Sequence, residues 1–93
     1  MRLTTEERKL LKASIYALDN SAKIYLFGSR VNDQKRGGDI DLLVFSNNLS
    51  RKNIRQIKDK FFRKFGEQRL DLVVPNNYNK AFIDFILEEA VEI

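Results

Sequence analysis

Two short polar motifs constrain most strongly what this chain can fold into, one at the end of an apolar run and one at the start of the next. Gly28-Ser29 ends one β-prone run, and Asp39-Ile40-Asp41 opens the next. An abrupt change from β-branched and aromatic residues to Gly-Ser is typical of a strand that ends in a turn. The sequence therefore predicts strands over residues 23–27 and 39–45, with polar residues at neighbouring strand ends.

The two aspartates are predicted to share one face of the second strand. Because side chains alternate along a strand, Asp39 and Asp41 point the same way, with Cα atoms roughly 7 Å apart. Ile40, Leu42 and Val44 take the opposite face, which must be core. Two carboxylates this close repel each other, so either one is protonated or a cation lies between them. Hard oxygen ligands suit Mg²⁺, which is usually held by one or two carboxylates together with substrate phosphates.

Gly28-Ser29 complements this carboxylate pair. Glycine lets the backbone approach a phosphate, and a helix that follows it would direct its N-terminal N–H groups at the anion. Each motif alone has an ordinary explanation, a turn for Gly-Ser and a soluble strand edge for Asp-x-Asp. Their combination, with nine residues between Ser29 and Asp39, is more specific and favours a site for a nucleoside triphosphate and Mg²⁺.

These motifs resemble those of a known family. Gly28-Ser29, the nine-residue gap and Asp39-Ile40-Asp41-Leu42 are similar to the signature of the DNA polymerase beta nucleotidyltransferase superfamily. In length the chain is most similar to the minimal nucleotidyltransferase (MNT) domains. The resemblance implies Mg²⁺-dependent transfer of AMP from ATP to a hydroxyl, with one or two ions bound. It also implies pairing with a separate HEPN-domain protein, as the antitoxin of a toxin–antitoxin pair in which a tyrosine of the toxin can receive the AMP.

The resemblance also assigns roles to residues of this chain. Asp71 lies in a third apolar run and matches the third catalytic carboxylate of the family by its context. The metal ligands and catalytic residues implied in this way are Asp39, Asp41 and Asp71, and the nucleotide-binding residues are Gly28, Ser29 and Arg30. An acidic residue inside an apolar strand is costly unless it is paired. An ion pair between Asp71 and a nearby Arg or Lys is therefore the structural alternative.

The chain departs from the family pattern at three positions near these motifs. Asn32 and Asp33 replace an arginine and a glycine that family members often have, and Gly38 stands where a serine commonly precedes the first aspartate. We expect these changes to weaken triphosphate binding and to leave the metal ligands intact. Lys35 and Arg36 could reach a triphosphate across the same loop, or could simply be solvated charges.

Composition excludes several kinds of chemistry. The 93 residues predict a single domain, 1–93, and include neither cysteine nor histidine. Disulfides, thiolate nucleophiles, histidine bases and histidine-ligated zinc are thus excluded. The first residues lack the apolar core of a signal peptide and no run reaches membrane length, so a cytoplasmic protein is expected. The net charge of +4 weakly favours anionic partners.

Three longer helices are expected around the strands. The first begins at a capping box of Thr4 and Glu7, and the second lies between Ser50 and Gly66. The third runs from about Tyr78 to the chain end, capped by Asn76 or Asn77. Strands joined through helices predict an α/β nucleotidyltransferase fold, with a small mixed sheet of at least three strands packed with helices.

The third predicted helix has more apolar residues than one buried face requires. They are Phe82, Ile83, Phe85, Ile86, Leu87, Ala90 and Val91. This surplus predicts a second burial partner, either another copy of the chain or a different protein. A helix boundary placed too late is the simpler explanation.

Three functions remain open at this stage. The enzyme is one, and a nucleotidyltransferase-like module that neutralises its partner by occlusion alone is the second. Nucleic-acid binding by the basic face of the second helix is the third, although no aromatic residues are interleaved with its charges. That basic face comprises Arg51, Lys52, Arg55, Lys58, Arg63 and Lys64. A small-molecule acceptor such as an aminoglycoside is also compatible with the enzyme.

Overall fold

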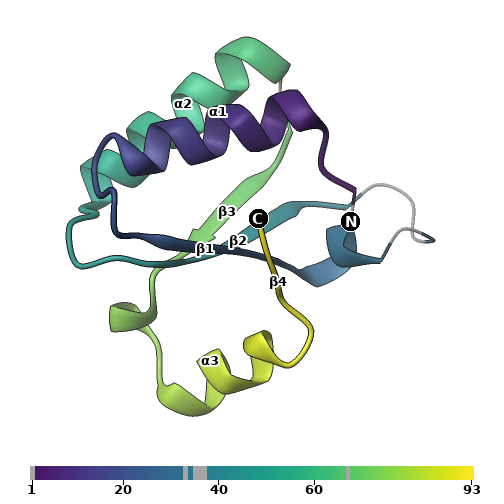
Figure 1. The fold of residues 1–93 in the computed structure, drawn as a ribbon, viewed down its shortest axis with the longest axis vertical. Coiled ribbons are helices and arrows are strands. Elements are labelled where there is room, and N and C mark those ends of the chain that lie inside the picture. The colour runs from purple at the N-terminus through teal and green to yellow at the C-terminus, as the bar shows by residue number, and fades with distance from the viewer. Residues whose placement is uncertain (1, 33, 35–37, 67) are drawn as a thin grey trace.

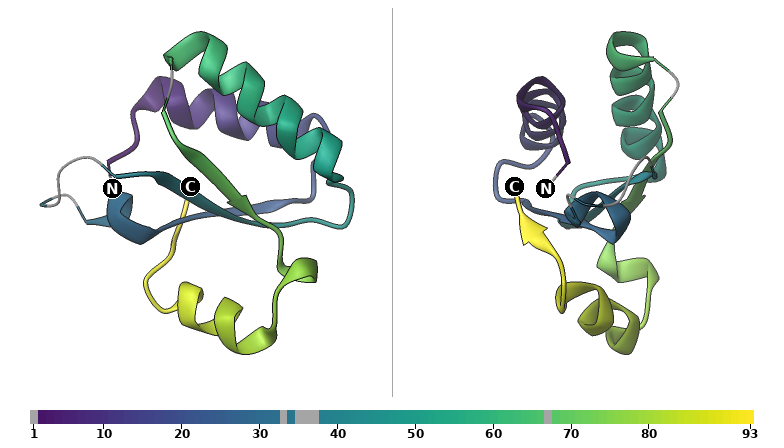
Figure 2. Two further views of the ribbon diagram at one scale, coloured as in Figure 1. Left: turned by 180° about the vertical axis from the view of Figure 1, so that it is seen from behind. Right: turned by 90° about the vertical axis from the view of Figure 1, so that its right-hand side faces the viewer.

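A computed structural model describes residues 2–32, 34, 38–66 and 68–93 of the chain. In this part of the chain, a mixed four-stranded sheet separates two helices on one face from a third helix on the other (Figure 1 and Figure 2). The expected α/β architecture is therefore confirmed. None of the helices within these ranges has both the length and the apolar character needed to cross a membrane.

The sheet has the order β3-β2-β1-β4. β1 (Lys23–Phe27) is antiparallel to both neighbours, β2 (Ile40–Phe45) and β4 (Val91–Glu92), whereas β2 is parallel to β3 (Leu70–Val73). The end of β1 therefore lies beside the starts of β2 and β3. In the register, Asp41 is opposite Phe27 on one side and Asp71 on the other.

The helices α1 (Thr5–Tyr16) and α2 (Arg51–Phe65) cover one face of the sheet. Both begin with a capping box, in which Thr4 and Ser50 accept hydrogen bonds from backbone N–H groups three residues later. Apolar side chains on their inner faces form the main core together with alternate strand residues. Its fully buried members include Leu11, Ile15, Leu26, Ile40, Leu42 and Phe61.

The end of the chain differs from the expected long helix. The helix α3 (Lys80–Leu87) is shorter, begins at Asn79 rather than at Asn76 or Asn77, and is followed by β4. Asn79 accepts a hydrogen bond from the Phe82 N–H at 2.8 Å, and a single 3₁₀ turn, Pro75–Asn77, precedes it. The last residue, Ile93, is buried in the core under α1 and α2, which draws the chain out of the helix and along β1.

Other predicted boundaries shift by one or two residues. α1 ends at Tyr16, so Leu18 lies beyond the helix and is 38% exposed. β2 begins at Ile40, directly after Asp39, and β3 ends at Val73. After α1, Asp19 accepts the Ser21 N–H in a local turn that does not continue the helix.

The apolar surplus near the chain end has two explanations. Part of it arose from the misplaced boundary, since Ala90 and Val91 lie outside α3. The rest is real: Ile83 and Ile86 are buried under the sheet, whereas Tyr78, Phe82 and Phe85 are exposed by 47%, 42% and 67%. The centroids of the Tyr78 and Phe82 rings lie 5.3 Å apart. We call these three exposed residues the α3 patch.

Candidate active site

The three predicted carboxylates lie at one end of the sheet, on the face covered by α3. Asp39 directly precedes β2, and Asp41 and Asp71 are paired residues of β2 and β3. Two residues farther along each of these strands, Leu43 and Val73 pack in the α3-side core. Because side chains alternate along a strand, Asp41 and Asp71 share that face. The sequence predicted polar residues at neighbouring strand ends, and the register brings Asp41 and Asp71 together there.

Burial and neighbouring negative charges both act on the Asp41 carboxyl. Burial raises the pKa of the Asp41 carboxyl above its ordinary value, and the charges of Asp71 and Asp39 raise it further. A hydrogen bond with the Asp71 side chain acts in the same direction, and the Arg69 charge opposes these effects. The cluster therefore favours an additional positive charge, from a proton or from a cation.

Arg69 partly supplies that charge. Its Nε lies 3.5 Å from Asp39 Oδ2 and 3.9 Å from Asp71 Oδ2, while its side chain is 75% exposed. The alternative considered for Asp71, an ion pair with a nearby basic residue, is therefore present. Sequence reasoning missed Arg69, although a signal existed: it lies two residues before Asp71, and alternate residues of an extended chain share a face.

The donor set suits a divalent cation, although its members are not gathered around one point. Carboxylate oxygens are the ligands that Mg²⁺ prefers, and repulsion at Asp41 would be relieved by a cation. Within the described residues, however, no group of three or more Asp, Glu, His or Cys side chains is arranged to hold a metal ion. An ion held by all three carboxylates would therefore require rotation of at least one of these side chains.

Gly28 lies directly against this cluster. It begins a 3₁₀ turn, η1 (Gly28–Val31), with a φ of +77°. A Cβ atom at this position would collide with Asp41 Oδ2, so only glycine lets the turn and the carboxylate lie so close. The short turn agrees with the prediction of a short helix or turn here. Because it is a single 3₁₀ turn and not an α-helix, it offers an anion only the N–H groups of that turn, and phosphate binding here stays a prediction.

Ser29 and Gly38 contact each other across the loop that separates the two motifs. Gly38 has a φ of +92°, and a Cβ there would meet Ser29 Oγ and lie 3.1 Å from Ser29 Cβ. A serine at position 38, as in the family pattern, would not fit this backbone. The expectations for Asp33, Lys35 and Arg36 concern residues outside the described ranges.

Hydrogen bonds from two arginines stabilise the turn at Gly28-Ser29. Arg30 donates hydrogen bonds to the carbonyls of Arg2 at 3.0 Å and Gly38 at 3.1 Å, and to Gln68 Oε1 at 3.5 Å. Arg2 donates in turn to the carbonyls of Ser29 and Asn32, each at 3.0 Å. These bonds give Arg30 a structural role, and its contact with a triphosphate stays a prediction. Nothing in the sequence pattern pointed to Arg2.

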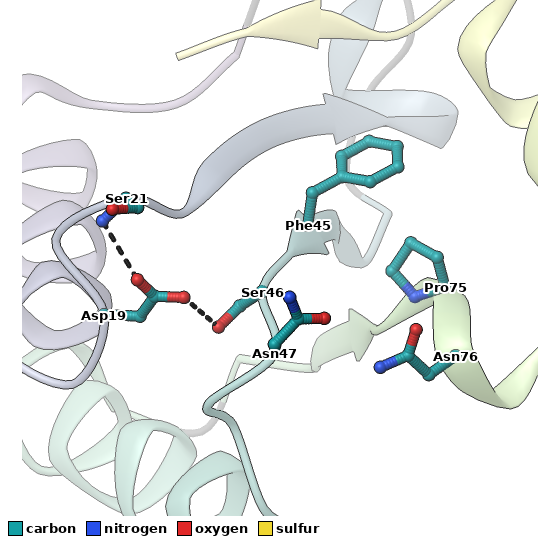
Figure 3. A pocket seen from close by; sticks show the side chains of 7 residues that line it. All are labelled: Asp19, Ser21, Phe45, Ser46, Asn47, Pro75 and Asn76. Carbon is teal, nitrogen blue, oxygen red and sulfur yellow. Dashed lines mark hydrogen bonds between the residues drawn. The ribbon is translucent and has the colours of Figure 1, made fainter.

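Two cavities lie at opposite ends of the sheet. One of about 290 Å³ adjoins Gly28 and is lined by Phe27, Gly28, Phe82, Phe85, Ile86, Glu88 and Glu89. The other, of about 310 Å³, lies far from the carboxylates, where β2 ends at Phe45 (Figure 3). There Asp19 accepts hydrogen bonds from the Ser21 N–H and the Ser46 hydroxyl, and so links two loops (Figure 3). Only the first cavity adjoins the cluster.

The raised pKa of Asp41 predicts a pH-dependent stability for the metal-free protein. Between the ordinary value of 3.8 and the raised pKa, the folded state binds more protons than the unfolded state. The free energy of unfolding therefore falls as pH rises through this window. Because Asp41 is partly solvated, we expect a change below about 1 kcal/mol.

Chemical denaturation in EDTA, from mildly acidic to neutral pH, measures this effect. Asp41→Asn should lack this component and should be more stable than the wild type at neutral pH. Identical pH profiles for the two proteins would contradict the prediction.

Comparisons with known proteins agree with this geometry. The model of the family "Polymerase beta, Nucleotidyltransferase" matches residues 9–93. A crystal structure of a mutant of the toxin–antitoxin complex MntA–HpeT is similar, with a TM-score of 0.68 and 23% identity over 94% of this chain and 68% of the other. A tri-AMPylated Shewanella oneidensis HEPN toxin in complex with MNT antitoxin gives a TM-score of 0.58 and 20% identity, over 91% and 70%.

No curated protein matches the chain. At these identities the two solved structures establish the fold alone, which is that of the MNT antitoxins. The family model covers far more than half of the sequence and includes all three carboxylates. The chain belongs to the polymerase beta nucleotidyltransferase family.

Proposed function

We propose that the protein is a Mg²⁺-dependent nucleotidyltransferase that transfers AMP from ATP to a hydroxyl of a HEPN-type partner, and thereby acts as an antitoxin. One observation carries the proposal: Asp39, Asp41 and Asp71 converge at one end and on one face of the sheet, beside Gly28. Family membership supports nucleotidyl transfer in general. Such convergence is not required for folding, because like charges near one another destabilise the fold.

In the proposed reaction, the acceptor oxygen forms a bond to the α-phosphorus of ATP. The bond from that phosphorus to the bridging oxygen of the β-phosphate breaks, and pyrophosphate leaves. Asp39 and Asp41 would hold the ion, and Asp71 would complete its site and accept the proton of the attacking hydroxyl. When bound, Mg²⁺ supplies positive charge to the attacking and leaving oxygens. Gly28 and Ser29 would hold the terminal phosphates at the turn.

The cavity next to Gly28 supports this arrangement. Its lining includes three phenylalanines, Phe27, Phe82 and Phe85, and it lies between the end of β1 and α3. Aromatic walls suit a flat ring, through stacked or edge-to-face contacts. We propose that the ring placed there belongs either to adenine or to the acceptor tyrosine, since both must lie near the α-phosphate.

A protein partner is supported by two independent observations. The structural neighbours are MNT antitoxins solved with their toxins, one of which is a tri-AMPylated HEPN toxin. The α3 patch adds exposed aromatic area next to the cavity at Gly28. Contiguous exposed apolar residues mark surfaces for association. We propose that the HEPN-type partner covers this patch and presents its hydroxyl to the site.

The occlusion module is the second candidate. The ion pairs of Arg69 with Asp39 and Asp71, and carboxylates that are not already gathered around a point, are features that a binding module without catalysis would share. It differs from the enzyme in one testable respect. Neutralisation by occlusion needs neither ATP nor Mg²⁺.

Incubation of the protein with α-labelled ATP, Mg²⁺ and the product of the adjacent gene tests the proposal. We expect label and an added AMP mass on the partner, lost when EDTA replaces Mg²⁺. Label from γ-labelled ATP should not be retained, because pyrophosphate leaves. A complex on size-exclusion chromatography that forms without any adduct would favour occlusion, and the absence of nucleotide binding would refute the enzyme.

A further inference from the structure

We infer that Arg69 is a built-in counter-cation, which partly neutralises the carboxylate cluster in the metal-free protein and must be displaced when a divalent ion binds. The inference rests on the proposed function, because it concerns the same metal site. It adds a regulatory property to that site: the affinity for metal is set partly by competition with the chain's own guanidinium group.

The position of Arg69 is fixed at the backbone. Its carbonyl accepts the Ile40 N–H at 2.9 Å, which continues the ladder between β2 and β3 just beyond their paired residues. The side chain of Arg69 therefore begins at the edge of the carboxylate cluster, between Asp39 and Asp71. Its Nε approaches Oδ2 of both residues, at 3.5 Å and 3.9 Å.

The side chain itself is free to move. It is 75% exposed, and both ion pairs are longer than a hydrogen bond. An exposed arginine in loose ion pairs loses little when it turns into solvent, because such pairs contribute little to stability. Arg69 can thus leave the cluster without disturbing the strand that carries it.

Arg69 and a divalent ion cannot both occupy this position. Mg²⁺ binds carboxylate oxygens at about 2.1 Å, so an ion held by Asp39 and Asp71 would lie where these oxygens now face the guanidinium. Two cations so close also repel each other. Ion binding would draw the carboxylates together and expel the guanidinium, whose Nε now faces Oδ2 of Asp39 and Asp71.

Metal binding without nucleotide tests the inference directly. The EDTA-treated protein is titrated with Mn²⁺, and free Mn²⁺ is measured by electron paramagnetic resonance. Removing the competing charge in Arg69→Gln should tighten Mn²⁺ binding roughly threefold to tenfold, the size expected for one exposed charge at this distance. Arg69→Lys keeps the charge and should remain closer to the wild type.

Two control variants show whether the measured Mn²⁺ binding and its change arise at the carboxylate cluster. Arg55→Gln removes the same charge from an exposed position on α2, on the opposite face of the sheet, and should leave the affinity unchanged. The double variant Asp39→Asn/Asp41→Asn should lose the binding. If the wild type binds Mn²⁺ at these aspartates and Arg69→Gln binds equally or more weakly, the inference is wrong while the metal site stands. If no variant and no wild-type protein binds Mn²⁺, both fail.

A measurement on the unaltered protein guards against a variant that folds poorly. The Arg69 Nε–H resonance is followed by NMR while Mg²⁺ is added. Displacement predicts that this resonance shifts during the titration and reaches the position of a solvated arginine, whereas the Arg55 resonance stays constant. A constant Arg69 resonance while Asp39 and Asp41 signals shift would overturn the inference.

Discussion

Replacing Asp41 with asparagine is expected to lower kcat/KM for AMP transfer by at least about a thousandfold, the scale of several kcal/mol of lost transition-state stabilisation. Asparagine has nearly the same shape but lacks the charge that a metal ligand at this position needs. Asp41 is also the member of the cluster closest to Gly28, since a Cβ on that glycine would meet its carboxylate. Transfer of label from α-labelled ATP to the partner measures the loss.

The folded state should not suffer from this change. Removing the Asp41 charge relieves the burial cost and the repulsion from Asp71 and Asp39 that together raise its pKa, so the variant should be at least as stable as the wild type. Asp59→Asn is the matched control, because Asp59 is an exposed carboxylate on α2 on the other face of the sheet. Activity of Asp41→Asn within tenfold of this control would exclude a catalytic metal site at Asp41.

Gly28→Ala is expected to cost both stability and activity. Alanine is strained at a φ of +77°, which costs about 1–2 kcal/mol of unfolding free energy. In addition, the new methyl group would push against the Asp41 carboxylate and displace it. Because a misplacement of about 1 Å at a reacting centre can cost about a hundredfold in rate, we expect a loss of that order.

Gly66→Ala separates these two effects. Gly66 has a φ of +81°, nearly that of Gly28, but a Cβ there would meet nothing within 4 Å. This variant should lose similar stability in urea denaturation and keep its activity. If both alanine variants lose activity equally, the contact between Gly28 and Asp41 is not what makes glycine necessary.

Features encoded in local patterns were predictable from the sequence. The capping box at Thr4, the helix start at Ser50, the first strand and the stop at Gly66 each depend on residues within a few positions of one another. The common face of Asp39 and Asp41 was predicted from alternation along one strand, whereas the position of Asp71 on the neighbouring strand was implied by the family resemblance. The family resemblance predicted how these elements combine into one fold, and the match of the family model confirmed the resemblance.

The features that were missed depend on contacts distant in sequence. β4 forms because Val91 and Glu92 find an unpaired edge of β1, some 65 residues earlier, and because Ile93 finds a place in the main core. Arg2 holds a turn 27 residues away. Arg69 was overlooked because a basic residue before a strand is ordinary, and only the parallel pairing of β2 with β3 places it beside Asp39.

The two outer strands of the sheet also influence how this molecule can meet others. β4 at one edge has 2 residues, and β3 at the other has 4 residues and is followed closely by Pro75. Short edges and nearby prolines give another chain little backbone to pair with, which protects against strand-to-strand aggregation. The proposed partner would therefore find more contact area on side-chain surfaces such as the α3 patch than along the sheet margins.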